Sequence, residues 1–406
     1  MKYLKRALEE EILRVSKSYP VVLVTGPRQV GKTTMLRKIA EDGRNYVSLD
    51  DMFIRQLAKD DPKLFLQRYK APLIIDEIQY APELLSYIKI IVDESEERGL
   101  YWITGSQMFH LMKNVSESLA GRVAVFNMYG LSNSEISQSK SSAYETEFDT
   151  LLKKMVSSSK QSLTDVFERI FRGSMPAVNS MEIDDVEMYY SSYVTTYLER
   201  DIRDLTQVGS LTDFLRFIQV CASRTGTLVN YSEIAKEVGI TSATAKNWMS
   251  LLISSGIVIH LQPYFNNALK RAVKSPKMYF MDTGLCAYLA RWTSPEALEV
   301  SAMAGEFFET YVISEIVKTY VNSGKKPPLY FYRDSNGKEI DLIIEKNNTL
   351  YPIEIKKSSS PKKSAIKNFP VLEKTSSQIG QGNVLCLSDD LLPIDDKNHI
   401  VPVWLI

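Results

Sequence analysis

The chain has 406 residues, of which 44% are hydrophobic and 24% are charged. This length exceeds what one compact core usually serves, so we expect two or three domains of the ordinary globular type. Lysine plus arginine and aspartate plus glutamate both number 49, which excludes a protein held to nucleic acid or to acidic membranes by its overall charge.

The first residues, MKYLKRALEEEILRV, alternate charged and apolar positions at helical spacing. No stretch of the chain approaches eighteen consecutive apolar residues, so neither a signal peptide nor a membrane span is expected. Cys221, Cys286 and Cys386 lie far apart and in no CxxC spacing, which favours free thiols in a reducing compartment. We therefore expect a cytoplasmic protein.

A phosphate-binding loop is the first motif along the chain. A β-rich run, Val21 to Val24, leads into GPRQVGKTT and then into a pattern with helical spacing. Strand, glycine loop and helix together form the context in which backbone N–H groups and the helix dipole bind phosphates. Lys32 would reach the β- and γ-phosphates, and the Thr33 hydroxyl would bind Mg²⁺. The predicted nucleotide-binding residues are Gly26, Pro27, Arg28, Gln29, Val30, Gly31, Lys32, Thr33 and Thr34.

Two acids follow at the end of a second apolar strand. In APLIIDEIQ the residues before Asp76 and Glu77 are apolar, which predicts a buried strand whose carboxyl end carries both acids. Asp76 would hold hydrated Mg²⁺, while Glu77 would orient or deprotonate the attacking water. An acid pair is otherwise often just the polar end of a strand.

Further polar residues are candidates for the γ-phosphate. The run LYWITGSQ ends in Thr104, Ser106 and Gln107, any of which can sense that phosphate or simply begin a polar loop. Arg122, in SLAGR, is a candidate arginine finger, acting in its own chain or from a neighbouring subunit; the alternative is an ordinary ion pair.

The segments GPRQVGKTT, YVSLDD, LIIDEIQ, ITGSQ and SLAGR, in this order, resemble the bacterial and archaeal AAA-type P-loop ATPases that carry a C-terminal domain of unknown function. The resemblance implies an AAA-like nucleotide-binding core, ATP and Mg²⁺ as cofactors, and a restriction-endonuclease-like C-terminal fold. It implies no particular substrate.

A helix-turn-helix pattern with a wing is predicted in the middle of the chain. Three helical patterns follow one another, with a glycine turn at Gly239 and a cap at Thr241 or Ser242, and then two β-like runs. The candidate recognition helix has one cation, Lys246, which is sparse for contact with phosphates. DNA contact would therefore fall to the wing, and packing or protein binding is the alternative. The basic wing residues are Lys270, Arg271, Lys274 and Lys277.

The stretch EIDLIIEKNNTLYPIEIKKS predicts a β-hairpin that turns at Asn347 and Asn348. Because side chains alternate along strands, Glu354 and Lys356 share one face and can meet Asp341 of the first arm. Two carboxylates that hold Mg²⁺ and a lysine that positions water can cut a phosphodiester, and the pattern is similar to the Asp…Glu-x-Lys core of restriction-like nucleases.

Other features of this region leave the prediction open. The helical pattern before the hairpin is expected to be amphipathic and offers Glu309 as a further acid. The alternative is the solvated face of a hairpin, and Pro352 indicates an edge strand or a strand start. A run of lysines follows, which suits phosphate contact or a solvated loop.

The predicted fold is α/β and multidomain. The predicted parts are residues 1–135, an AAA-like P-loop ATPase with a parallel sheet; 136–163, a mobile linker rich in serine and lysine; 164–210, a helical connector; 211–300, a winged helix-turn-helix; and 301–406, a restriction-endonuclease-like α/β domain.

Two functions fit these parts. In the first, the nucleotide state of an ATPase controls a Mg²⁺-dependent, nucleic-acid-interacting nuclease module. In the second, the chain is an ATP-gated switch or scaffold whose nuclease-like domain does not cleave and binds protein partners. A homo-oligomer is compatible with both.

Overall fold

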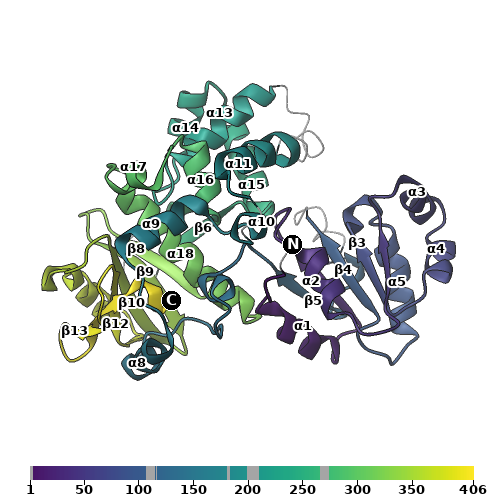
Figure 1. The fold of residues 1–406 in the computed structure, drawn as a ribbon, viewed down its shortest axis with the longest axis horizontal. Helices are drawn as coiled ribbons and strands as arrows, with labels where there is room; N and C mark the ends of the chain where they lie inside the picture. Colours follow the sequence, from purple (N-terminus) through teal and green to yellow (C-terminus); the bar gives the residue numbers. More distant parts are fainter. Residues whose placement is uncertain (1–2, 107–114, 116, 181–182, 199–209, 266–273) are drawn as a thin grey trace.

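The computed structural model describes residues 3–406 with the exception of residues 107–114, 116, 181–182, 199–209 and 266–273. The N-terminal part of the chain forms a five-stranded, fully parallel sheet in the order β2-β3-β4-β1-β5, seen on the right of Figure 1. Its strands are β1 (Val21–Thr25), β2 (Asn45–Ser48), β3 (Leu73–Asp76), β4 (Tyr101–Gly105) and β5 (Val123–Asn127). The helices here are α1 (Leu8–Ser16), α2 (Lys32–Ile39), α3 (Met52–Asp60), α4 (Pro62–Arg68), the 3-10 turn η1 (Ile78–Tyr80) and α5 (Leu84–Asp93).

Helices cover both faces of this sheet. Along β1, Val22 and Val24 belong to the same core as residues of α1 and α2, whereas Val21 and Leu23 belong to a core shared with α4 and α5. A strand that is buried on both faces is apolar throughout, which explains the continuous run of hydrophobic residues in its sequence. The carboxyl ends of all five strands then share one edge, and the glycine loop lies there.

The segment after this sheet differs from the predicted mobile linker. It contains α7 (Asn133–Ile136) and the ten-residue α8 (Phe148–Ser157). Tyr144 is buried, and its phenolic oxygen accepts a hydrogen bond of 3.0 Å from Asn383 near the C-terminus. The expectation of a mobile segment was wrong because the apolar residues of α8 recur at helical spacing and because Tyr144 and Phe148 pack against the C-terminal part of the chain.

A group of helices and one hairpin follows. The helices are α9 (Leu163–Arg172), α10 (Pro176–Asn179), α11 (Val186–Tyr193), the π-helical turn η2 (Val194–Leu198), α13 (Leu211–Ala222), α14 (Tyr231–Val238), α15 (Ser242–Ser254), α16 (Thr283–Leu289) and α17 (Pro295–Glu299). Strands β6 (Val258–Pro263) and β7 (Lys277–Phe280) pair antiparallel. Gly239 ends α14 with a φ of 87°, and the Thr241 side chain caps α15. Three helices and a hairpin thus occur in the expected order, and their assignment as a winged helix stays a prediction.

The C-terminal part is β-rich. It contains α18 (Ala304–Asn322), β8 (Leu329–Arg333), β9 (Glu339–Lys346), β10 (Thr349–Lys356), η3 (Lys363–Ile366), η4 (Phe369–Lys374), β11 (Gln378–Ile379), β12 (Gly382–Cys386), β13 (Leu392–Pro393), β14 (Asn398–Pro402) and η5 (Val403–Leu405). The sheet order is β13-β14-β12-β10-β9-β8-β6-β7, with β11 beside β10. Because β6 pairs with β8, the hairpin of the middle region extends the C-terminal sheet.

Three details of this sheet bear on the predictions. The turn at Asn347 and Asn348 is confirmed, with φ of 51° and 58°. The edge position of Pro352 was wrong, because β10 lies between β9 and β12. On one side of β10, β11 pairs with Leu350 and β12 pairs with Ile353. Proline is tolerated because Pro352 lies between these two pairings, where no strand needs its backbone N–H. Helix α18 was expected to be amphipathic but is buried almost all round.

No helix in the described parts of the chain is long and apolar enough to cross a membrane.

Candidate functional site

The glycine loop between β1 and α2 has the geometry that phosphate binding requires. Gly26 and Gly31 have φ of 143° and 92°, a region that other residues rarely adopt. A Cβ atom on Gly26 would lie 2.0 Å from the carbonyl oxygen of Met128, so only glycine fits. The Lys32 ammonium donates to the carbonyls of Gly26 (2.9 Å) and Pro27 (2.8 Å), which places it inside the loop.

The two residues predicted to bind Mg²⁺ at this loop lie together. The Thr33 hydroxyl donates to Oδ1 of Asp76 at 2.5 Å, and the Thr104 hydroxyl donates to the same oxygen at 2.5 Å. Tyr46 donates to the other carboxylate oxygen at 3.2 Å. A hydroxyl and a carboxylate oxygen at contact distance match the ligands that Mg²⁺ takes at such loops, so these residues fit the ion.

Glu77 is held beside them in an unusual backbone conformation. Its φ of 56° is left-handed, which costs free energy for a residue with a Cβ and is found mainly at functional sites. Its backbone N–H donates to the Thr104 hydroxyl at 3.1 Å. Its carboxylate accepts hydrogen bonds from Ser106 (3.3 Å) and from the Gln79 amide. Ser106 thus lies at the predicted place, and Gln107 is outside the described residues.

Arg122 lies at the other end of the sheet. Its carbonyl accepts from the N–H of Val21, the first residue of β1, whereas the glycine loop follows the last residue of that strand. Its guanidinium forms a two-point ion pair with Asp93. The structure therefore does not bring Arg122 to the glycine loop of its own chain. Its contacts are those of an ordinary ion pair, which was the alternative prediction. A role of Arg122 in a neighbouring subunit stays a prediction.

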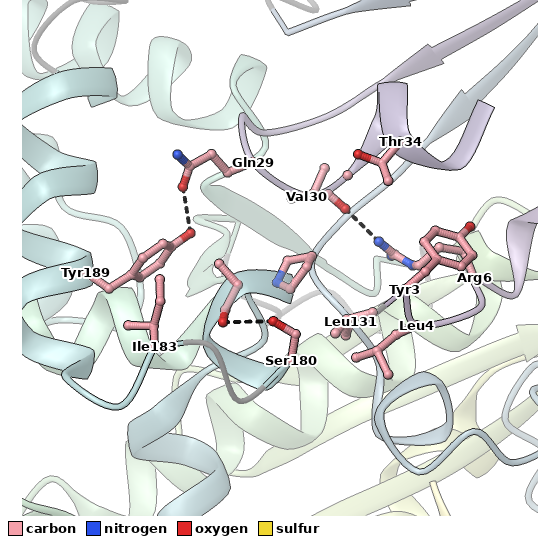
Figure 2. A pocket seen from close by; sticks show the side chains of 13 residues that line it. Tyr3, Leu4, Arg6, Gln29, Val30, Thr34, Leu131, Ser180, Ile183 and Tyr189 are labelled. Carbon is pink, nitrogen blue, oxygen red and sulfur yellow. Dashed lines mark hydrogen bonds between the residues drawn. The ribbon is translucent and has the colours of Figure 1, made fainter. Parts of the chain in front are cut away.

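A pocket of about 450 Å³ opens beside the glycine loop. Figure 2 shows Tyr189 and Ile183 of the middle region on one side and the N-terminal residues Tyr3 and Leu4 on the other. The Tyr189 hydroxyl donates to Gln29 of the loop at 2.8 Å. The lining residues are Tyr3, Leu4, Arg6, Gln29, Val30, Gly31, Thr34, Leu131, Pro176, Ala177, Ser180, Ile183 and Tyr189.

The hairpin of β9 and β10 forms a second polar site. The Lys356 ammonium lies 2.6 Å from Oε1 of Glu354 and 3.6 Å from Oδ2 of Asp341. The three groups expected to converge therefore do so. They line one wall of a pocket of about 700 Å³, with Lys357, Lys362 and Lys367 also among its lining residues.

The two carboxylates of this site are buried and repel each other. Asp341 and Glu354 are each 7% exposed. Burial, followed by repulsion from Asp341, raises the pKa of Glu354 to about 8. Oε2 of Glu354 has no hydrogen-bond partner among the described residues. A carboxylate oxygen that is buried without a partner beside a second carboxylate fits a divalent cation, which would satisfy it.

The number of ligands at this site is small. In the part of the chain that the structure describes, no three histidine, cysteine, aspartate or glutamate side chains are grouped so that they could hold a metal ion. Two carboxylates suit Mg²⁺ nevertheless, because that ion usually keeps several water ligands and takes others from phosphate.

Glu309 faces a different set of groups. Its carboxylate accepts from the ammonium of Lys277 at 3.0 Å and from the Tyr279 hydroxyl at 2.5 Å. Burial raises its pKa to about 7, although the neighbouring Lys277 opposes the shift. Burial opposes the charge of Lys277, but Glu309, Asp341 and Glu339 raise its pKa well above the usual value.

The prediction that Lys277 contacts DNA from a wing was wrong. The residue is 3% exposed and pairs with Glu309 and with Glu339, the latter at 2.5 Å. Lys274 is exposed, and Lys270 and Arg271 are outside the described residues.

Several residues at the two sites escaped the sequence analysis because their roles depend on contacts between distant segments. They are Tyr46, Gln79 and Tyr189 at the first site and Lys277, Tyr279 and Glu339 at the second. The only signal available for them was an aromatic or charged residue inside a β-like or helical run, which is too common to indicate a role.

A parallel sheet with a Gly-x4-Gly-Lys-Thr loop and with Asp76 and Glu77 at the end of a neighbouring strand defines a P-loop nucleotide hydrolase. The family model described as "AAA domain" matches residues 18–137. Models described as "Domain of unknown function (DUF8612)" and "Domain of unknown function (DUF4143)" match residues 163–296 and 304–406. The chain therefore contains an AAA domain of the P-loop type, and it carries a C-terminal domain of unknown function.

The chain is similar to two curated proteins, both called uncharacterized, from Mycobacterium bovis and Mycobacterium tuberculosis. Each is 28% identical over 400 residues, which are 98% of this chain and 83% of the relative. Among solved structures, it is similar to the Walker-type ATPase of Pyrococcus abyssi, with 14% identity, a TM-score of 0.45, and coverage of 71% of this chain and 96% of that one.

Proposed function

We propose that this AAA-type ATPase uses its nucleotide state to control a Mg²⁺-dependent, nuclease-like site on the C-terminal sheet, and that this site acts on nucleic acid. One observation carries the proposal. Lys356 contacts Glu354 at 2.6 Å and Asp341 at 3.6 Å in a pocket that is also lined by lysines.

At the glycine loop the roles follow from the contacts. Thr33 and Asp76 would hold Mg²⁺, which would supply positive charge beside the phosphates. Lys32, now bonded to loop carbonyls, turns to the phosphate oxygens when ATP enters. Glu77, held by Ser106 and Gln79, orients the attacking water.

The pocket of about 450 Å³ next to this loop suits the base of ATP. Tyr3, Leu4, Val30 and Ile183 give it a largely apolar lining, as small-ligand sites usually have. The lining comes from the N-terminal segment, the glycine loop and the middle region. Binding of the nucleotide would therefore hold the middle region against the ATPase sheet.

At the C-terminal site, Asp341 and Glu354 would hold Mg²⁺, which supplies a Lewis acid for a phosphodiester oxygen and lowers the pKa of bound water. Lys356, bonded to both carboxylates, is placed to position that water. Lys357, Lys362 and other lysines on the pocket lining would contact flanking phosphates of a nucleic-acid strand.

Control of the C-terminal site by the nucleotide state is supported first by the contacts of Arg6. Its buried guanidinium donates to the Val30 carbonyl of the glycine loop at 2.7 Å and to Glu135 at 2.8 Å. A shift of the loop on ATP binding would therefore move the segment that contains Glu135.

The same segment contacts α18. The N–H of Asn133 donates to Glu315 at 2.8 Å, and the Lys318 ammonium donates to the Leu131 carbonyl at 3.3 Å. Polar contacts therefore run from the glycine loop to α18, and α18 itself connects them to Glu309 near the C-terminal site.

The test is to incubate the full chain with linear, circular and single-stranded DNA and with RNA, in Mg²⁺ or Mn²⁺, with and without ATP. The Asp341→Asn protein should lose cleavage, and the Lys32→Ala protein should lose ATP hydrolysis and any response of cleavage to ATP. Asp334→Asn is the matched control, because Asp334 is also 7% exposed but lies outside the pocket. Cleavage that persists in Asp341→Asn would refute the assignment of this site.

A second candidate, an ATP-gated switch with a non-cleaving domain that binds a protein partner, is favoured by one observation. No three metal-binding side chains are grouped among the described residues, so the C-terminal site has the smallest ligand set compatible with Mg²⁺ chemistry. ATP hydrolysis without cleavage of any of the four substrates would select this candidate over the first.

A further inference from the structure

The pocket on the C-terminal sheet is part of a larger charged cluster that two regions of the chain build together. Among the described residues, four carboxylates and two ammonium groups meet there. The carboxylates are Glu309, Glu339, Asp341 and Glu354, and the ammonium groups are Lys277 and Lys356. Lys277 comes from β7 of the middle region, and the other five groups come from the C-terminal region.

The cluster has two halves with different exposure. Lys356 forms ion pairs with Asp341 and Glu354, and its side chain is 43% exposed at the pocket. Lys277 forms ion pairs with Glu309 at 3.0 Å and with Glu339 at 2.5 Å, and its side chain is 4% exposed. The first half is therefore open to a ligand from solvent. In the second half the Lys277 ammonium is enclosed, although Glu339 also lines the pocket and its side chain is 26% exposed.

We propose that this site holds a single divalent cation, between Asp341 and Glu354, and that the ammonium of Lys277 takes the place of a second cation in neutralising Glu309 and Glu339. The inference rests on the proposed function, because it assumes a metal at the nuclease-like site. It goes further by fixing the number of ions and by assigning a positioning role to a residue outside the C-terminal domain.

The charges of the cluster lead to this stoichiometry. Glu309 and Glu339 already face two cations, because Lys277 pairs with both of them and Arg333 lies 3.5 Å from Glu339. A divalent cation added to these two carboxylates would therefore be in excess, and an uncompensated buried charge is unfavourable. Asp341 and Glu354 share one cation, Lys356, so these two carboxylates can still take a divalent cation.

Lys277 is fixed in this position by the strand that carries it. Its ammonium lies 5.6 Å from the centre of the Phe331 ring, so the side chain packs against the core of the sheet. Tyr279 is two residues along β7 and therefore points to the same side, where its hydroxyl also binds Glu309. Two side chains of β7 thus donate to the same oxygen of Glu309, Oε1, which occupies that oxygen and disfavours it as a ligand for an ion.

The test is to count bound Mn²⁺ by electron paramagnetic resonance and by calorimetry on the full chain without nucleotide. Every protein carries Asp76→Asn, so that the ATPase site lacks the carboxylate assigned to Mg²⁺ there. We expect one Mn²⁺ per chain, and none when Asp341→Asn is added. In Lys277→Met the count should rise from one to two, because Glu309 and Glu339 lose their cation. Lys277→Arg keeps the charge and should remain at one.

Each result decides a different point. No Mn²⁺ in the parent protein would overturn the metal site itself, and the proposed nuclease function with it. Two Mn²⁺ in the parent protein would overturn the inference alone. A count that stays at one in Lys277→Met would remove the role of Lys277. If Lys277→Met does not fold, as judged by circular dichroism, the count in the parent protein and in Lys277→Arg still decides the stoichiometry.

Discussion

Replacing Glu354 by glutamine should stabilise the protein, and the gain should increase with pH. Burial and the neighbouring Asp341 raise the pKa of Glu354 to about 8, whereas the usual value for an exposed glutamate is 4.5. Between these two values the folded chain holds a proton that the unfolded chain has lost. The free energy of unfolding therefore falls as pH rises through this range, and glutamine removes that loss.

The magnitude follows from the size of the shift. Each pH unit within the range is worth about 1.4 kcal/mol, so the carboxyl lowers the free energy of unfolding by about 3 kcal/mol at pH 7. The glutamine amide oxygen can keep the contact with Lys356, and a less favourable geometry of that hydrogen bond offsets about 1 kcal/mol. We expect a net gain of about 2 kcal/mol at pH 7 and almost none near pH 5.

Urea unfolding at pH 5, 6, 7 and 8, followed by tryptophan fluorescence, measures this difference. Glu135 supplies a control of opposite sign. It is just as buried, but Arg6 and backbone N–H groups lower its pKa despite that burial, so Glu135→Gln should destabilise the protein at neutral pH. A stability difference between Glu354→Gln and the parent chain that does not grow with pH would refute the reasoning. Adding Mg²⁺ should stabilise the parent chain more than Glu354→Gln, because in the parent chain the ion can replace the proton of Glu354.

Three further changes test other contacts. Gly26→Ala should weaken ATP binding at least tenfold in a fluorescent-nucleotide titration, because its Cβ would lie 2.0 Å from the carbonyl oxygen of Met128. Arg6→Ala should lower the free energy of unfolding by about 3 kcal/mol in the same urea assay, because it leaves Glu135 charged and buried without its ion-pair partner. Glu77→Gln should retain ATP binding but slow phosphate release on the order of a hundredfold, as expected for loss of a general base.

Much of the ATPase region could be predicted from the sequence because its determinants are local. The glycine loop requires residues at fixed spacing between one strand and one helix, and β1 and α2 occur where the pattern places them. Asp76 and Thr33 are 43 positions apart, yet their meeting follows from parallel strands that end at one edge. The orientation of the sheet also explains why Arg122 is distant, which a linear motif does not reveal.

The structure of the segments outside the ATPase region depends on contacts with residues that are distant in the sequence, so local sequence patterns do not predict it. Tyr144 lies in a stretch rich in serine and lysine, and composition alone favours a mobile chain there. Its backbone N–H and carbonyl nevertheless bond to Thr319 and Tyr320 of α18. Two hydrogen bonds to a buried helix order a segment whose own apolar content is too small to form a core.

Lys277 shows most clearly why charge patterns mislead at the second site. Four basic residues within eight positions predict a cationic surface, and three of them are exposed or outside the described residues. The fourth begins β7, and the pairing of β6 with β8 carries that strand onto the sheet that bears Asp341. The same lysine then neutralises two acids in place of contacting phosphate. Its role is therefore set by how two regions of the chain join, so the C-terminal domain alone would lack part of the charge balance of its own site.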